Sequence, residues 1–349
     1  MTMKAKEIAK LLGISPASVS LVLNNKPGVS ETTRNKVFEI VKELGCEELL
    51  PDKVEETKTI LFLVYRKNGI RTEESPYFSQ IFSDIMEGVE NQAKNSGYKL
   101  MVTYADHKSV AAEVGKIRGE KIDGLLLLAT EMVKAQMKLF TDLRVPVVII
   151  DNYMESEDMD CVAINNEQGV DVAVSFLVSM GHEEIGYLHV DGSAYNFIER
   201  YYGFMRSIRE NNLSSGKITI IEFTSGGGET VYPELKKRIT QLKKMPTAFF
   251  ADNDIIAIGT IRVLREMGYR IPEDISIIGF DDISLSEMMD PPLTTIQIPK
   301  YAIGCVAVNT LVSRIGGNFE GIKKIEMKTA LMKRNSVKSL IKSNEPFIE

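Results

Sequence analysis

Two pairs of carboxylates are the residues whose types and spacing come closest to catalytic machinery. Asp252 and Asp254 flank a single asparagine, and Asp281 and Asp282 are neighbours. Paired carboxylates can hydrolyse a glycosidic bond, one acting as general acid and the other as base or nucleophile. Carboxylates that bind the hydroxyl groups of a ligand explain both pairs with fewer assumptions. We therefore favour binding over catalysis.

Other signatures of enzyme chemistry are missing from the sequence. It contains neither a GxxxxGKS/T phosphate loop nor a GxSxG elbow, and the glycines at 226–228 lack the spacing of a dinucleotide fingerprint. The three cysteines, Cys46, Cys161 and Cys305, are far apart, which favours reduced buried thiols over a disulfide framework or a zinc site. We expect a protein without catalytic residues, metal or cofactor.

The size and composition indicate a globular protein with more than one core. Its 349 residues exceed what one compact core accommodates, and contents of 44% hydrophobic and 26% charged residues are ordinary for soluble proteins. No apolar run approaches membrane-spanning length, and the charged start MTMKAKEIAKLLGIS lacks the apolar stretch of a secretory signal. These features predict a cytoplasmic protein that does not enter a membrane.

Positive charge is concentrated at the start of the chain. The formal net charge of −6 argues against nucleic-acid binding by the whole surface. Residues 1–45 nevertheless carry seven Lys and Arg against four Glu, a net charge of +3. Any contact with DNA is therefore expected in this segment.

The pattern of residues 1–45 predicts a helix-turn-helix. Apolar residues recur at helical spacing in three short stripes, so three helices can share one small core. Gly13 ends the first stripe, and Ser15 followed by proline begins the second. The small Ala9 before the glycine and Val19 after it are typical of two closely crossing helices. A three-helix bundle with ordinary caps is the alternative interpretation.

In a helix-turn-helix the second helix enters the major groove, and its early exposed side chains face base edges. Short hydroxyl and amide side chains near helix starts suit phosphate oxygens. The expected base contacts are Pro16, Ala17, Ser20 and Leu21. The expected phosphate contacts are Ser15, Ser18, Asn24, Ser30 and Thr33.

The stretch KEIAKLLGISPASVSLVLNNKPGVSETTRNKVFEIVKELG resembles the headpiece of the lactose-repressor (LacI) family over its whole length. The resemblance implies a transcription repressor that binds double-stranded operator DNA. One departure concerns specificity, because the family usually has an arginine that reads a guanine where this sequence has Leu21. The operator sequence of relatives cannot be carried over.

Residues 46–58 are expected to form a linker. In the resembled family this segment is a hinge helix, rich in Arg and Asn, that inserts a leucine into the minor groove. The segment here contains five acidic residues, which phosphates would repel. We predict little or no minor-groove insertion, with Leu49 and Leu50 as weak candidates.

Residues 59–340 are expected to form an effector-binding and dimerisation domain. The apolar runs TILFLVY, YKLMVT, DGLLLL, PVVII, EIGYLHV, KITIIEF, TAFFA and ISIIGF alternate with amphipathic stretches. This pattern predicts βαβ units in two doubly wound parallel-sheet lobes, as in periplasmic binding proteins, with a ligand cleft at the strands' carboxyl ends. We expect lobe 1 at about 59–160 and 293–322, and lobe 2 at about 161–292 and 323–335.

Further motifs, among them SMGHEEIGYLHV, ERYYGF and GFDD, resemble the family's effector-binding core. The resemblance implies a small, sugar-like effector and these contacts: Tyr77, Phe78, Asp151, Arg200, Phe223, Asn253, Asp254 and Asp281. For the polar residues the alternative role is a strand-end cap or a surface charge. For Phe78 and Phe223 the alternative is core packing.

The loop YRKNGIRTEESPYF is longer than usual in the family and begins near Arg66. We take a solvated charged loop as the simpler interpretation, and recognition of a phosphate or uronate by Arg66 as the sharper hypothesis.

The last residues lack apolar heptads, so we expect a homodimer rather than the tetramer of the lactose repressor. Three other functions stay open at this point. A sugar-binding transport protein or a sugar-processing enzyme would share the two-lobed fold. A regulator whose effector tightens DNA binding, as in purine repression within the family, would share the whole architecture.

Overall fold

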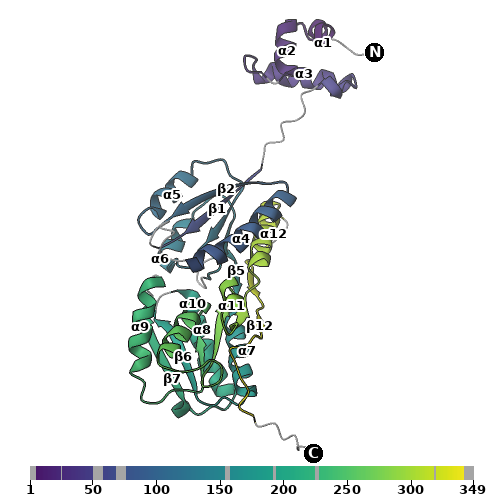
Figure 1. Cartoon of the computed structure of the whole chain (residues 1–349). Coiled ribbons are helices and arrows are strands. Elements are labelled where there is room, and N and C mark those ends of the chain that lie inside the picture. Colours follow the sequence, from purple (N-terminus) through teal and green to yellow (C-terminus); the bar gives the residue numbers. More distant parts are fainter. Residues whose placement is uncertain are drawn as a thin grey trace, which may run out of the picture. The chain divides into compact units, whose positions relative to one another are not determined.

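The computed structural model describes residues 5–24, 26–49, 58–67, 76–153, 158–191, 194–224, 228–317 and 320–341. The chain divides into two compact units, Met1–Lys58 and Thr59–Glu349 (Figure 1). Each unit contains its own clusters of buried apolar side chains.

The first unit is a three-helix bundle. It consists of α1 (Ala5–Leu12), α2 (Pro16–Leu23), α3 (Glu31–Glu43) and the 3-10 turn η1 (Glu47–Leu49). Gly13 has a φ of +65°, a left-handed conformation that glycine tolerates, and it closes α1. Ser15 caps α2 by accepting a hydrogen bond from the amide of Ser18 at 3.0 Å. The predicted turn and cap are both present, and the core joins all three helices through Ile8, Ala9, Val19, Val22, Val37 and Val41.

The second unit contains two sheets, each of which defines a lobe. The first sheet has six parallel strands in the order β11-β5-β4-β3-β1-β2. Its strands are β1 (Thr59–Tyr65), β2 (Lys99–Ala105), β3 (Gly124–Leu128), β4 (Val147–Ile150), β5 (Asp160–Ile164) and β11 (Lys324–Met327). Its helices are α4 (Pro76–Asn95), α5 (Val110–Ile117), α6 (Lys134–Met137), the 3-10 turn η2 (Lys138–Phe140) and α12 (Lys300–Ile315).

The second sheet has the order β12-β10-β9-β8-β6-β7 and is parallel except for β12, which runs antiparallel to β10. Its strands are β6 (Ile185–Asp191), β7 (Ile218–Thr224), β8 (Ala248–Ala251), β9 (Ser276–Asp281), β10 (Thr294–Gln297) and β12 (Ala330–Met332). Its helices are α7 (Asn166–Ser179), α8 (Tyr195–Glu210), the turn η3 (Ser215–Lys217), α9 (Gly228–Thr240), α10 (Asp254–Glu266) and α11 (Ser284–Met288). None of the described helices has the length and apolar character needed to cross a membrane.

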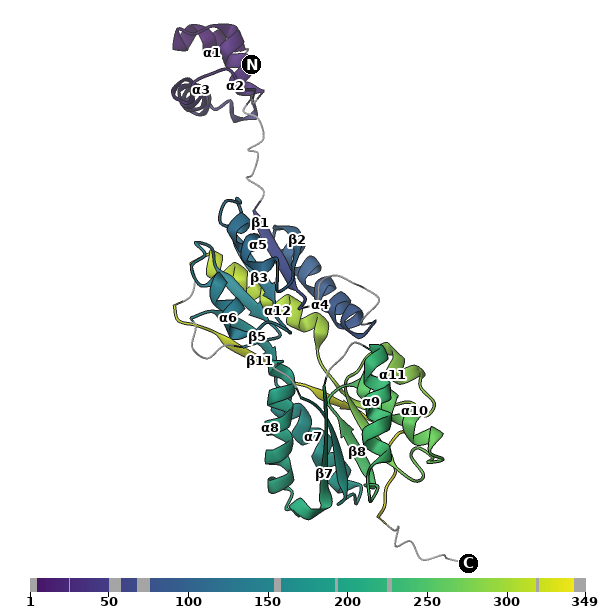
Figure 2. The ribbon, with the colours of Figure 1, turned by 90° about the vertical axis from the view of Figure 1, so that its left-hand side faces the viewer.

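Helices α4 and α12 pack side by side in the first lobe, although they are far apart in the sequence (Figure 2). Glycines allow this contact. A Cβ atom on Gly88 would lie 2.1 Å from the carbonyl oxygen of Tyr301, and one on Gly304 would lie 2.3 Å from that of Ile85. A late segment of the chain thus completes the lobe that begins at Thr59.

The chain passes between the two sheets three times, and the lobe boundaries differ from the expected ones at each passage. Residues 161–164 belong to β5 of the first sheet, although they were assigned to the second lobe. Strand β10 belongs to the second sheet and β11 to the first, the reverse of the expectation for residues 293–297 and 324–327. Hydrogen bonds between strands that are far apart in the sequence decide which sheet each strand belongs to. Short strands with polar residues have no sequence pattern that predicts this pairing.

Candidate functional site

Arg200 of α8 is a buried arginine, 2% exposed, whose guanidinium contacts three different elements. Its Nε donates to Oδ1 of Asn166 at 2.9 Å, its Nη2 donates to Oδ1 of Asp281 at 3.0 Å, and its Nη1 donates to the carbonyl oxygen of Asp252. The guanidinium carbon also lies 3.7 Å from the centroid of the Phe280 ring. These contacts fix the orientation of Arg200, and the Asp281 carboxylate balances its charge.

Asp281 ends β9 in an unusual backbone conformation. Its φ is +105° and that of Asp282 is +51°, both in the left-handed range that costs energy for residues other than glycine. Asp282 is held by Nη2 of Arg334 at 2.7 Å and by Nε2 of Gln297 at 2.8 Å. The surrounding hydrogen bonds therefore maintain a turn that presents Asp281 to Arg200.

A polar contact joins the two lobes beside Arg200. Nδ2 of Asn196 in the second lobe donates to Oδ1 of Asp151, which follows β4 of the first lobe, at 3.0 Å. Oδ1 of Asn196 in turn accepts from Nδ2 of Asn166 at 2.9 Å. We call Asp151, Asn166, Asn196, Arg200 and Asp281 the Arg200 cluster.

Asp151 is 3% exposed, and burial raises its pKa to about 6 from the ordinary 3.8. The hydrogen bond from Oγ1 of Thr130 to Oδ2, at 2.7 Å, lowers the pKa, as do the hydrogen bond from Asn196 and the charge of Arg200. The effect of burial on this pKa therefore outweighs the effects of the two hydrogen bonds and of the Arg200 charge. The carboxyl of Asp151 can gain a proton near neutral pH.

Asp252 lies behind Arg200 and is completely buried. Its carboxylate accepts from the hydroxyl of Tyr187 and from the amide of Val190 at 2.7 Å, and Nδ1 of His189 lies 2.9 Å from Oδ2. Burial, followed by the charge of Asp252, raises the pKa of Tyr187 well above its ordinary value. The sequence suggested Asp252 only as half of a catalytic pair, whereas it positions the carbonyl group that holds Arg200.

Asp254 is also completely buried, and the contacts of its carboxylate lie within the second lobe. Oδ2 accepts from the amide of Ile283 at 2.9 Å and from Oγ of Ser286 at 2.7 Å, while Oδ1 accepts from Oγ1 of Thr295 at 2.5 Å. Burial and the charge of Asp281 raise the pKa of Asp254 to about 7. These contacts join α10 to β10 and to the segment after β9.

Two further expected contacts have structural partners. Asn253 is 7% exposed and caps α10, with Oδ1 accepting from the amide of Ile256 at 2.9 Å. Phe223 is 1% exposed and packs in the core of the second lobe with Leu188 and Leu235. Core packing, which was the alternative for Phe223, fits this position better than a wall for a ligand.

The remaining expected effector contacts belong to the first lobe. Arg66 is half-buried directly after β1, and its amide donates to the carbonyl oxygen of Ala105 at 2.9 Å. Tyr77 and Phe78 begin α4, but their side chains lie outside the described part of the structure. Of the nine expected contacts, hydrogen bonds bring Asp151, Arg200 and Asp281 together, whereas Asn166 and Asn196 were not anticipated.

The expected DNA contacts lie on α2 and at the start of α3. The positions 16, 17, 20, 21 and 24 recur at helical spacing and face one side of α2. Several polar side chains there already have partners: Oγ of Ser15 lies 2.8 Å from Oγ of Ser18, and Oγ of Ser30 lies 2.9 Å from Oγ1 of Thr33. They can still reach phosphates, since a hydroxyl both donates and accepts.

The linker is described only at its start. Leu49 is partly buried against the core of the first unit, and its amide donates to the carbonyl oxygen of Cys46 at 2.9 Å. Residues 50–57, with Leu50, lie outside the described residues.

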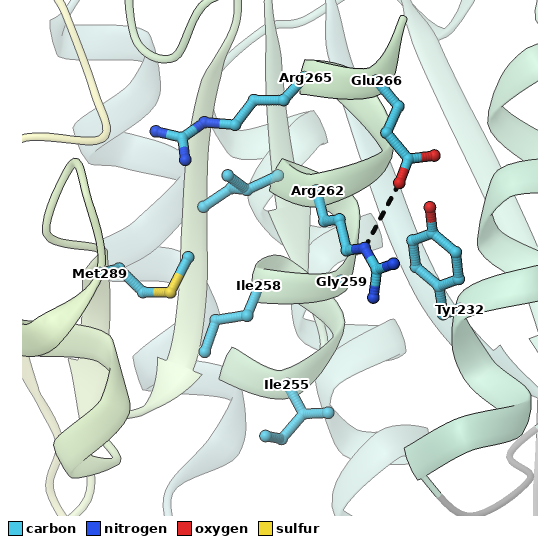
Figure 3. A pocket seen from close by; sticks show the side chains of 9 residues that line it. Tyr232, Ile255, Ile258, Gly259, Arg262, Arg265, Glu266 and Met289 are labelled. Atoms are coloured by element: carbon cyan, nitrogen blue, oxygen red, sulfur yellow. Dashed lines mark hydrogen bonds and ion pairs between the residues drawn. The ribbon is translucent and has the colours of Figure 1, made fainter.

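A groove with a volume of about 620 Å³ runs along the outer side of α10 (Figure 3). Ile255, Ile258 and Met289 lie on one side of the helix, and Tyr232 lies on the other. Nearby on α11, Met288 is 72% exposed. Leu285 on the same helix is 45% exposed, so apolar side chains reach the surface beside the groove.

Comparison with known proteins identifies the family. Residues 4–46 match the family described as bacterial regulatory proteins, lacI family, and residues 174–337 match a periplasmic binding protein-like domain. The HTH-type transcriptional repressor PurR of Aliivibrio salmonicida (strain LFI1238) is 34% identical over 343 residues, which cover 96% of this chain and 99% of the relative. The chain belongs to the LacI family. PurR of Vibrio campbellii (strain ATCC BAA-1116) is 32% identical over 346 residues, covering 96% of this chain and 98% of that protein.

Solved structures of LacI-family proteins have the same fold. The complex of the transcriptional regulator CelR with cellobiose has a TM-score of 0.68 and 26% identity, over 96% of this chain and 99% of that chain. The lac repressor dimer bound to operator and the anti-inducer ONPF has a TM-score of 0.69 and 22% identity, over 97% and 100% of the two chains. As a LacI-family member, the chain is a DNA-binding transcription regulator and not an enzyme.

Proposed function

We propose that the chain represses transcription as a homodimer, and that a small, carbohydrate-like effector bound at the Arg200 cluster changes its affinity for operator DNA. The observation that carries this proposal is the composition of the cluster. It contains one buried guanidinium, two buried carboxylates and two amides, at the carboxyl ends of strands from both lobes. Ligands of doubly wound sheets bind at such strand ends.

The chemistry of the cluster suits a ligand with several hydroxyl groups. Carboxylates accept hydrogen bonds, whereas the guanidinium and the amides donate them, so neighbouring hydroxyls find both kinds of partner. The complex of CelR with cellobiose supports a sugar. A purine is the alternative effector, because purine repression occurs within the family and the relatives with 34% and 32% identity are named as PurR repressors.

Further contacts with the effector are proposed around the cluster. Asn253, Tyr77 and Phe78 keep their expected role, with Asn253 also serving as a helix cap. Arg66 is proposed to bind a phosphate or carboxylate group if the effector is acidic. An Arg66→Ala variant that binds the identified effector with unchanged affinity would contradict that role.

The partner of the first unit is proposed to be double-stranded operator DNA in the cytoplasm, contacted by α2 and the start of α3. Base edges would face Pro16, Ala17, Ser20 and Leu21. Phosphates would contact Ser15, Ser18, Asn24, Ser30 and Thr33. The net charge of +3 over residues 1–45 supports this assignment, because the rest of the chain is strongly acidic.

A homodimer is supported by apolar surface at two places in the second unit. One is the groove along α10, and the other is the edge strand β2, where Met101, Val102 and Tyr104 are between 37% and 40% exposed. A second copy of the chain that packs against both places would remove their apolar surface from water. The lac repressor, which has the same fold, was solved as a dimer on its operator.

Effector binding is proposed to act through the contact between Asn196 and Asp151. A ligand inserted beside this contact would change the orientation of one lobe relative to the other. The DNA affinity of a dimer depends on such a change, because its two headpieces must match the spacing of two half-sites. Coupling of this kind is typically worth about 1–3 kcal/mol. We expect the effector to lower operator affinity; the corepressor alternative predicts the opposite sign.

A thermal-shift screen tests the proposal. Mono- and disaccharides, sugar phosphates, uronates and purine bases are added to the purified protein, because a ligand that binds only the folded state raises its melting temperature. Operator affinity is then titrated with and without the compound found. Unchanged operator affinity at saturating effector would reject the switch.

A further inference from the structure

The recognition helix α2 has an unusual composition for a DNA reader. Its eight residues, PASVSLVL, include no charged side chain. Guanine is most often read by a bidentate arginine or lysine, and α2 offers neither. The basic residues of the described headpiece lie instead in α1, in α3 and in the turn between α2 and α3, among them Lys6, Lys10, Lys26, Arg34 and Lys36.

The polar side chains around α2 are largely occupied by local hydrogen bonds. Ser15 and Ser18 cap the start of the helix and contact each other. Nδ2 of Asn24 donates to the carbonyl oxygen of Ser20 at 2.8 Å and approaches its Oγ at 3.4 Å. These contacts use part of the hydrogen-bonding capacity of each side chain, and none of the side chains offers the paired donors with which an arginine reads guanine.

Leu21 is an apolar side chain that the headpiece core does not use. It is half-buried, and it is absent from the cluster of apolar side chains that pack together within residues 5–49. A Cβ atom on Gly28 would lie 3.6 Å from its Cδ1, so the turn after α2 supports the leucine from one side. Ala17, one helical turn earlier, is exposed on the same side of α2.

Apolar side chains that face base edges in the major groove recognise the 5-methyl group of thymine. We propose that α2 reads its operator half-site mainly through thymine methyl groups, with Leu21 and Ala17 as specificity-determining residues. This inference rests on the proposed DNA contacts of α2. Positive charge elsewhere in the headpiece would supply phosphate contacts that are independent of sequence.

The test begins with the unaltered, full-length protein. An operator is selected from random duplexes, and each of its thymines is replaced singly by deoxyuridine, which removes only the methyl group. We expect about fourfold weaker binding by fluorescence anisotropy at the one or two thymines that face Leu21 in each half-site, the loss expected for one buried methyl group.

Variants then assign the methyl contact to a residue. Leu21→Ala should bind the thymine and deoxyuridine operators equally at the position that Leu21 reads, and the slope of affinity against salt should not change. Leu11→Ala is the matched control, since Leu11 is a 58% exposed leucine of α1, and it should keep the full deoxyuridine penalty. Circular dichroism confirms that both variants are folded.

Two results would overturn the inference. One is an operator that tolerates deoxyuridine at every position, and the other is a Leu21→Ala protein that keeps the complete penalty. Failure to select any duplex is a different outcome, because it would reject DNA binding itself and not only the manner of reading.

Discussion

The side-chain amide of Asn196 donates to the carboxylate of Asp151 at 3.0 Å, so the hydrogen bonds that hold Arg200 continue from the second lobe into the first. The accepting carboxylate is buried, and its pKa is raised to about 6. The contact between the lobes therefore includes a group that changes charge near physiological pH.

The first prediction concerns the pH dependence of stability. Asp151 binds a proton more tightly in the folded than in the unfolded protein, so its contribution is present at low pH and is lost as pH rises through about 6. Between about pH 5 and pH 7.5, Asp151→Asn should gain about 1 kcal/mol of unfolding free energy relative to the unaltered protein. Urea titrations at the two pH values measure this. Asp142→Asn, at an exposed position, is the matched control for the substitution itself.

The second prediction concerns the space beside Asp254. A Cβ atom on Gly279 would lie 2.1 Å from Oδ1 of Asp254, which is already hydrogen-bonded to Thr295. Gly279→Ala should lower the unfolding free energy by about 2–3 kcal/mol, because the carboxylate must leave its partners. Gly115→Ala is the control: nothing lies within 4 Å of its added Cβ in α5, and it should be neutral or stabilising. Equal stability of the two variants would contradict the packing described.

The third prediction separates effector binding from DNA binding. Arg200→Met should weaken effector binding by about 2–5 kcal/mol, since it removes a buried charged donor that contacts Asp281 at 3.0 Å. Operator affinity without effector should change far less. Calorimetry and anisotropy measure the two affinities. Arg206→Met on the same helix, where the arginine side chain is 45% exposed, should bind effector normally.

The fourth prediction concerns the groove along α10. Ile258→Asp should place a charge in the proposed contact between two copies and convert the dimer to monomers in sedimentation velocity. Ile322→Asp is the matched control, because Ile322 is a 49% exposed isoleucine outside the groove. The groove is not the dimer contact if both variants sediment as the unaltered protein does.

The fifth prediction concerns the linker. We expect Leu49→Ala and Leu50→Ala to bind operator within about twofold of the unaltered protein, because repulsion between the acidic linker and phosphates opposes minor-groove insertion. A minor-groove probe should still reach the central base pairs of the complex. Protection of those base pairs would show that the linker inserts after all.

The elements that sequence reasoning located well are those with strong local signals. The helix-turn-helix was predicted because a glycine turn, a serine cap and small residues at fixed spacing act within a few residues of one another. The long apolar runs were found as strands for a similar reason, since parallel strands covered on both faces must be apolar throughout.

What sequence reasoning missed depends on distant contacts. Strand β5 was not anticipated, because its five residues, DCVAI, begin with an aspartate that Arg314 of α12 neutralises at 2.6 Å. The contacts of Asp254 within the protein were not anticipated, because its partners Ser286 and Thr295 follow much later in the chain. Motif resemblance pointed to Asp151, Arg200 and Asp281, but it did not indicate the asparagines, Asn166 and Asn196, that join them by hydrogen bonds.

The three passages between the lobes also constrain how the protein can be made. Strand β11 forms an edge of the first sheet and β12 an edge of the second, and both lie after residue 320. A ribosome must therefore release almost the entire polypeptide before either lobe can close its sheet. Premature stop codons anywhere upstream would leave both lobes unfinished at once, rather than sparing one of them.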